Sequence, residues 1–92
     1  MEISDAMTVV VEFFGPFRAF GKEREVALVG PVCYRELVNS LTADLGPEFA
    51  ERAARKNTTV IINKRIAGRK SLETLVIEPG DRVAFALLLG GG

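Results

Sequence analysis

The chain has 92 residues, of which 48% are hydrophobic and 26% are charged, with one cysteine and no histidine. This length allows one domain with a single modest core, and the composition is that of a folded chain and not of a disordered one. Twelve basic residues balance twelve acidic ones, so the net charge gives no indication of a nucleic acid or an anionic membrane as a partner.

The charges are distributed unevenly along the chain. The first fifty residues contain eight acidic and four basic residues, whereas the stretch from Arg52 to Lys70 contains seven basic residues and no acidic one. Two interpretations of this stretch stay open. It is either a set of solvated turns and helix faces or a basic patch that meets an acidic partner surface.

The sequence also limits the compartment. A single cysteine, Cys33, excludes an internal disulfide, and the first residues lack the basic and apolar regions of a signal peptide. No apolar run is long enough to span a bilayer. We therefore expect a cytoplasmic protein that does not enter a membrane.

Residues 1–7 are acidic and without periodicity, and we expect them to be a flexible leader to a single domain over residues 8–92. The next segment, Thr8–Phe14, is rich in β-branched and aromatic residues, which predicts a strand. Alternation assigns Phe13 to one face of that strand and Glu12 and Phe14 to a second, wetter face. A Gly-Pro turn and an irregular loop then lead to a second strand over residues 24–30, which predicts a hairpin.

From Tyr34 the apolar period becomes helical and continues to Leu45, where Gly46 and Pro47 indicate the end of a helix. A second, shorter helix is predicted from Pro47, because proline is favoured at the first helical position. Its inward-facing residues are predicted to be Phe49, Ala50, Ala53 and Ala54.

The last third of the chain predicts further strands. An apolar strand ends at Ile62, a polar turn follows over residues 63–65, and a short strand returns through Ile66. Residues 69–77 predict a turn or short helix with a bridging strand, and residues 78–81 read Glu-Pro-Gly-Asp, a type II turn. The final strand runs from Arg82 to about Leu88. This order predicts an α+β domain of the β-grasp (ubiquitin-like) type, with a mixed sheet, one main helix across one face and a short second helix.

Most catalytic constellations are missing from this sequence. Without histidine there is no usual zinc site, no Cys-His pair and no Ser-His-Asp triad. No glycine-rich phosphate loop joins a strand to a helix. We therefore expect no bound cofactor, no metal and no catalysis by the chain alone.

The chain ends on Gly90, Gly91 and Gly92. At an average glycine usage of about 7%, three consecutive glycines at a given position arise by chance in roughly three or four chains per ten thousand. Glycine lets a backbone pass a narrow channel, and the terminal carboxylate then becomes the distinctive reactive group. Because a carboxylate is unreactive by itself, its chemistry would need activation by ATP on another protein. The alternative is a frayed end.

The apolar residues of the last strand are also relevant to partner binding. If Phe85 and Leu87 face the helix, alternation assigns Leu88 to the wetter face together with Phe14. Exposed apolar residues of this kind mark partner interfaces. We therefore predict that Leu88 and Leu89 guide docking, while the alternative is that the chain itself covers them.

From Thr8 to Gly92 the sequence resembles the small sulfur-carrier subunit of molybdopterin synthase (MoaD-like), a ubiquitin-like β-grasp family related to the thiamine sulfur carrier ThiS. The resemblance rests on "VEFFGPFRAFG", with Arg18 and Gly21 where the family tends to have an arginine and a glycine, and on "YRELVNSL" and "VIINKRI". The ending "IEPGDRVAFALLLGGG" is the most specific part, because it aligns Gly91 and Gly92 with the diglycine of the family.

The resemblance implies a function for the terminus. A ubiquitin-activating-like enzyme would use ATP to adenylate the Gly92 carboxylate, which is then converted to a thiocarboxylate. Docked into the large subunit of molybdopterin synthase, the tail would donate sulfur to the pterin precursor. Phe14 and Ile66 match apolar positions that the family uses for docking, whereas Ala86 departs from a position that is often aromatic.

Other functions remain possible at this point. A ubiquitin-like modifier would use the same activated Gly92 to form an isopeptide bond with a lysine. A thiamine-type sulfur carrier is a further alternative, although those proteins are shorter and lack room for a helix over residues 47–56. A β-grasp binding domain with merely flexible glycines is the third class.

Overall fold

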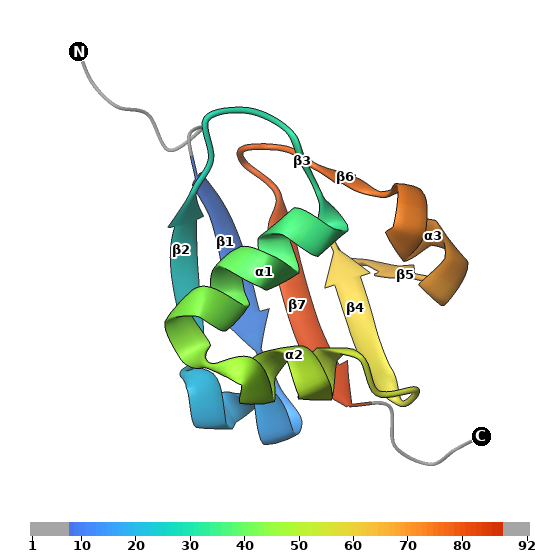
Figure 1. Cartoon of the computed structure of the whole chain (residues 1–92). Helices are drawn as coiled ribbons and strands as arrows, with labels where there is room; N and C mark the ends of the chain where they lie inside the picture. The colour runs from blue at the N-terminus through green and yellow to red at the C-terminus, as the bar shows by residue number, and fades with distance from the viewer. Residues whose placement is uncertain (1–7, 88–92) are drawn as a thin grey trace.

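The computed structural model describes residues 8–87, in which helices cover one face of a five-stranded sheet (Figure 1). The sheet order is β2-β1-β7-β4-β5. Its strands are β1 (Thr8–Phe13), β2 (Glu23–Ala27), β4 (Thr58–Ile62), β5 (Arg65–Ala67) and β7 (Arg82–Leu87). A separate pair is formed by β3 (Val32–Cys33) and β6 (Val76–Ile77). The helices are the 3-10 helix η2 (Gly15–Phe20), α1 (Tyr34–Leu45), α2 (Pro47–Ala53) and α3 (Arg69–Thr74).

The sheet is mixed because its first and last strands pair in parallel. β1 pairs with β2 antiparallel and with β7 parallel, and β7 pairs antiparallel with β4. β5 completes the other edge by antiparallel pairing with β4. This arrangement confirms the predicted β-grasp fold, and it makes β7 the central strand.

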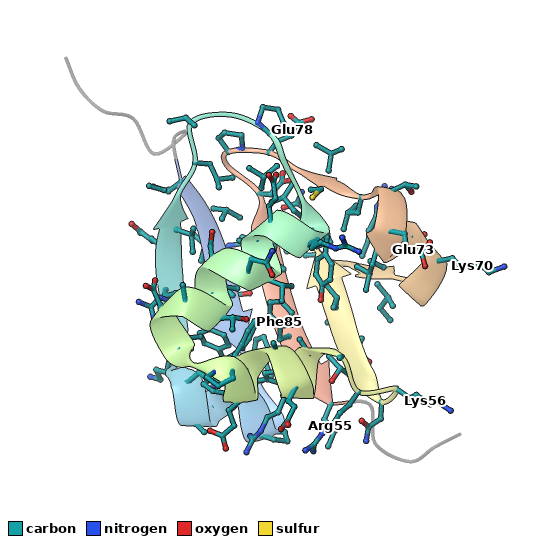
Figure 2. The ribbon with its side chains drawn as sticks, in the orientation of Figure 1. Arg55, Lys56, Lys70, Glu73, Glu78 and Phe85 are labelled. Carbon is teal, nitrogen blue, oxygen red and sulfur yellow. The ribbon has the colours of Figure 1, made fainter. Side chains whose placement is uncertain are left out.

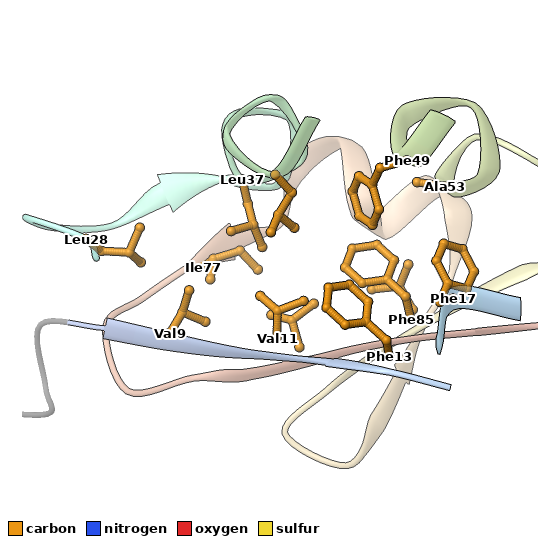
Figure 3. Packing of buried hydrophobic residues seen from close by; sticks show 13 residues of the cluster. Val9, Val11, Phe13, Phe17, Leu28, Leu37, Phe49, Ala53, Ile77 and Phe85 are labelled. Carbon is orange, nitrogen blue, oxygen red and sulfur yellow. The ribbon is translucent and has the colours of Figure 1, made fainter. Parts of the chain in front are cut away.

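The core fills the space between the sheet and its helices (Figure 3). The predicted alternation in β1 is confirmed, because Val9, Val11 and Phe13 are buried while the residues between them are only partly covered. Aromatic rings fill the end of the core below α2, with 5.1 Å between the ring centroids of Phe49 and Phe85. Edge-to-face contact of this kind adds about 0.5–1.5 kcal/mol to the burial of the rings.

The main helix has the boundaries that the sequence predicts. At its start the Glu36 carboxylate accepts a hydrogen bond from the Cys33 backbone N–H at 3.3 Å, which completes a capping box. At its end Gly46 has a φ of +100°, a conformation that disfavours other residues, and its N–H donates to Thr42. The predicted short strand after residues 63–65 and the turn before β7 are likewise confirmed, with Gly80 at φ +96°.

The structure differs from the sequence-based expectation at several places. β1 ends at Phe13, and the loop after it is the 3-10 helix η2, which buries Phe17. The second strand covers only residues 23–27. Residues 32–33 form an unpredicted strand, because two residues carry no periodicity. Ala54 is exposed, since α2 ends one residue before it.

Candidate functional site

The central strand leads toward the carboxyl terminus. β7 ends at Leu87, which lies opposite Thr58 at the start of β4. Figure 1 shows this end of β7 beside η2 and α2. Leu88, Leu89, Gly90, Gly91 and Gly92 lie outside the described residues, so the roles predicted for them stay predictions. The structure describes the sheet up to Leu87, the residue that precedes them in the sequence.

The helices leave one face of the sheet uncovered, and we call it the outer face. β7 lies at its centre. Alternation assigns Arg82, Ala84 and Ala86 of β7 to this outer face, because Val83 and Phe85 point into the core. The strand register then aligns one row of residues across four strands, which consists of Glu12, Ala84, Ile61 and Ile66. In this row the outer face is therefore apolar over β7, β4 and β5.

Two of the four residues predicted to dock a partner, Phe14 and Ile66, belong to this face. Phe14 has extended backbone angles that continue β1, its N–H donates to the Phe85 carbonyl at 2.9 Å, and 42% of its surface is exposed. Ile66 is 74% exposed and lies opposite Ile61. Phe14 and Ile66 belong to strands three positions apart, so about 14 Å of sheet separates them laterally. The fold thus brings them to one surface.

Short side chains lie between these two. Ala84 is buried and Ala86 is half-buried, and both belong to the strand between Phe14 and β4. With alanine at residue 86 the surface has no aromatic ring at its centre. The apolar contact area therefore depends on Phe14, Ile61 and Ile66.

The outer face carries an ion pair between β7 and β1 and further acidic residues on β2. The Arg82 guanidinium contacts the Glu12 carboxylate at 3.4 Å, with side chains 49% and 30% exposed. Glu12 lies opposite Glu23 in the register, and Glu25 lies opposite Val10. The β1–β2 side of the face is therefore acidic, in contrast to the apolar side over β4 and β5.

The 3-10 helix beside Phe14 is held by contacts that the sequence did not indicate. The Arg18 side chain donates to the Phe13 carbonyl at 2.8 Å, and the Arg52 side chain donates to the Pro16 carbonyl at 2.8 Å. Arg52 also lies over the Phe20 ring, 5.6 Å from its centroid. These contacts fix the backbone that follows Phe14. In the sequence, only Pro16 followed by Phe17 and Phe20 could have indicated this short helix.

A different pair of turns is fixed at the opposite end of β7. The Asn63 side-chain amide donates to the Asp81 carboxylate at 3.0 Å, and its oxygen accepts from the Arg82 N–H at 2.9 Å. The Asp81 carboxylate in turn accepts from the Glu78 N–H at 2.9 Å. Asn63 therefore joins the β4–β5 turn to the turn that starts β7.

Two further properties concern the described residues only. Between residues 8 and 87, no group of three or more cysteine and carboxylate side chains is placed to hold a metal ion. None of the helices in this part of the chain is long and apolar enough to cross a membrane.

The sequence matches no protein-family model and has no significant match among curated proteins. Solved structures do resemble the fold. The HVO 2177 protein of Haloferax volcanii superposes with a TM-score of 0.74 at 20% identity, over 94% of this chain and 87% of that one. Small archaeal modifier protein 1 (SAMP1) of Methanosarcina acetivorans gives a TM-score of 0.68 at 19% identity, over 92% and 96% of the two chains.

A third similar structure is the thiamine biosynthesis protein ThiS of Geobacter metallireducens. It gives a TM-score of 0.58 at 23% identity, over 94% of this chain and all of that one. At these identities the likeness concerns the fold and leaves the chemistry open. The resemblance expected from the sequence is thus confirmed at the level of architecture, and the chain has the ubiquitin-like β-grasp fold of SAMP1 and ThiS.

Proposed function

We propose that this protein is a ubiquitin-like sulfur carrier, the small subunit of a molybdopterin synthase. An adenylating enzyme activates the Gly92 carboxylate, and the resulting thiocarboxylate donates sulfur to the pterin precursor in the large subunit. The chain binds no cofactor of its own, and ATP is bound by the activating enzyme.

The proposed chemistry needs only the terminal carboxylate from this chain. Its oxygen attacks the α-phosphorus of ATP, which forms the acyl-adenylate and releases pyrophosphate. Hydrosulfide from a donor then attacks the carbonyl carbon, so that a C–S bond forms, the C–O bond to phosphate breaks and AMP leaves. No side chain of Gly92 hinders the nucleophile.

One observation supports this proposal most directly. The central strand ends at Leu87, five residues before Gly92, beside an outer face that exposes Phe14 and Ile66. Five extended residues reach up to about 17 Å. A partner that docks on the outer face would therefore have its active site within reach of the carboxylate.

The experiment is intact-mass analysis of the full chain after incubation with ATP, the adenylating enzyme and hydrosulfide. We expect the mass increase of an oxygen-to-sulfur exchange on the C-terminal peptide. A variant without Gly91 and Gly92 should show no such increase, whereas a variant without residues 1–7 should react as the full chain does. Loss of sulfur incorporation in both variants, or in neither, would contradict the proposal.

A second candidate function is protein modification through Gly92, because the fold matches SAMP1 more closely than ThiS by TM-score. In that case a lysine amine attacks the adenylate carbonyl, forms an isopeptide bond and displaces AMP. Expression of a tagged chain in cells would distinguish the two functions. A ladder of lysine conjugates that depends on Gly92 supports the modifier, and thiocarboxylate without conjugates supports the carrier.

A thiamine-type carrier would form the same thiocarboxylate. It is distinguished by the acceptor, which is a thiazole precursor in place of a pterin. Reconstitution with each acceptor separates them, since transfer to the pterin precursor alone supports molybdopterin synthesis.

A further inference from the structure

The basic run from Arg52 to Lys70 has no part in the proposed function, and residues near its two ends, Ala53, Ala54 and Lys70, line one groove. This helix-side groove lies between α1, α2 and α3 and has a volume of about 730 Å³. Ala53 and Ala54 line it from the α2 side, and Lys70 lines it from α3. In Figure 2, Lys70 extends from α3 and Lys56 extends from the turn after α2. The groove borders the helices, whereas Phe14 and Ile66 belong to the outer face of the sheet.

The floor of the helix-side groove is apolar. Val38 of α1 and Leu72 of α3 line it, and both are partly buried against the core. The wall from α2 carries only alanine side chains there, so a large side chain of another molecule can approach the helix backbone. Cys33 also lines the groove, and its partner in the β3–β6 pair, Val76, is 52% exposed. Residues opposite each other in such a pair share a face, so the apolar surface extends to Val76.

The residues that line the groove carry one net positive charge, from two basic residues and one acidic residue. Arg35 of α1 and Lys70 of α3 line the groove, and Glu73 is the acidic residue in its lining. Neither base takes part in the ion pairs Arg24–Asp44 and Glu12–Arg82 of the described residues. Arg52, by contrast, is occupied by the Pro16 carbonyl and the Phe20 ring. Charged rims of this kind select a partner of opposite sign and speed its encounter.

We propose that the helix-side groove binds a segment of a partner protein that carries a large apolar side chain flanked by acidic residues. The apolar side chain covers Val38, Ala53 and Leu72, and the flanking carboxylates meet Arg35 and Lys70. A basic segment would place like charges together around the same floor. This binding does not rest on the carrier function, because it uses the opposite side of the sheet.

Two synthetic peptides of equal length test the proposal. Both carry a central leucine, flanked by glutamates in one peptide and by lysines in the other, and each is titrated into the full chain labelled with ¹⁵N. We expect the acidic peptide to shift the amide signals of Val38, Ala53 and Leu72 and to leave that of Ile66 unchanged. Its affinity should fall as salt is added and exceed that of the basic peptide by about fivefold or more.

Matched variants separate charge from packing. Lys70→Glu should weaken the acidic peptide about fivefold, whereas Lys22→Glu, an equal change at an exposed residue outside the groove, should not. Ala54→Trp should block binding by filling the groove, and Ala43→Trp on the exposed side of α1 should leave it intact.

Several results would overturn the proposal. Equal binding of both peptides, no shift with either, or shifts confined to the Ile66 face would each show that the groove does not select acidic segments. Concentration-dependent dimerisation that shifts the same amides would assign the groove to a second copy. A shift of the Ala53 amide on removal of residues 1–7 would assign it to the chain's own N-terminal segment.

Discussion

Phe14 and Ile66 are apolar side chains that do not belong to the buried core. Both are exposed, at 42% and 74%, on the face that the helices leave open. Water contact with apolar surface is unfavourable by roughly 25 cal/mol per Å², so covering these side chains with a partner stabilises a complex. At the residue scale, binding and folding should therefore respond to different substitutions.

Replacing Phe14 or Ile66 by glutamate tests that separation. We expect each change to weaken binding to the adenylating enzyme by about tenfold, because central apolar contacts of an interface commonly contribute more than 1 kcal/mol. The free energy of unfolding should change by less than about 0.5 kcal/mol, as is usual for exposed residues. Isothermal titration and urea denaturation give the two quantities. Val29→Glu is the control, because Val29 is 96% exposed and belongs to the loop before β3. Equal loss of affinity in that control would contradict a specific docking face.

Asn63 illustrates a polar residue whose effect is on folding. Its side chain joins two turns through Asp81 and Arg82, and its φ of 49° is one that asparagine tolerates better than most residues. We expect Asn63→Ala to lower the free energy of unfolding by about 2 kcal/mol. Lys64→Ala is the matched control, since Lys64 also has a positive φ of 74°. An equal cost in both variants, measured by urea denaturation, would assign the effect to backbone conformation alone.

Among the elements, η2 differs most from what the sequence predicts. The loop predicted after β1 is a 3-10 helix that inserts Phe17 among other rings, with its centroid 5.7 Å from that of Phe85. Local propensity did not indicate this, because such short helices form when tertiary contacts supply what their hydrogen bonds lack. The same helix follows Phe14 directly, so packing of Phe17 also fixes the backbone next to Phe14, the residue predicted to dock a partner.

Phe17→Ala should therefore behave as a core substitution. We expect a loss of about 3–5 kcal/mol in the free energy of unfolding, because the removed ring leaves a cavity beside Phe49 and Phe85. Phe14→Ala, three residues earlier, should cost less than about 1 kcal/mol. Urea denaturation of both variants measures the difference. Similar values for the two would show that η2 does not belong to the core.

In the whole molecule, the described core and the chemistry proposed for the terminus involve separate parts of the sequence. The buried hydrophobic residues of the described part extend from Val9 to Phe85. The glycines come after this span in the sequence, and Leu87, the last described residue, pairs with Thr58. Changes to the terminus should therefore affect reaction without affecting stability.

Removal of Gly92 alone tests this separation. We expect the melting temperature to stay within about 1 °C, because a terminal residue outside the core contributes little to folding, and we expect no thiocarboxylate to form. Calorimetry and intact-mass analysis measure the two effects. Val83→Ala, a core substitution in β7, is the opposite control. It should lower the melting temperature while any folded fraction still reacts. A large fall in melting temperature without Gly92 would contradict a terminus independent of the core.

Local sequence patterns predicted the elements whose signal is periodic. Alternation identified the buried side of β1, and helical spacing with Gly46 and Pro47 identified both ends of α1. These signals are local, since each depends on residues a few positions apart. The expected location in the cytoplasm and the separate leader over residues 1–7 stay predictions.

Which distant residues share a surface depends on the tertiary structure. The parallel pairing of β1 with β7 and the return of β4 and β5 bring Phe14 and Ile66 to one face. Packing of three helices likewise unites Ala53 with Lys70 in one groove. Strand order and helix packing are set by long-range burial of apolar surface. Local sequence patterns therefore indicate which side of an element is apolar, but they do not indicate which other element will cover it.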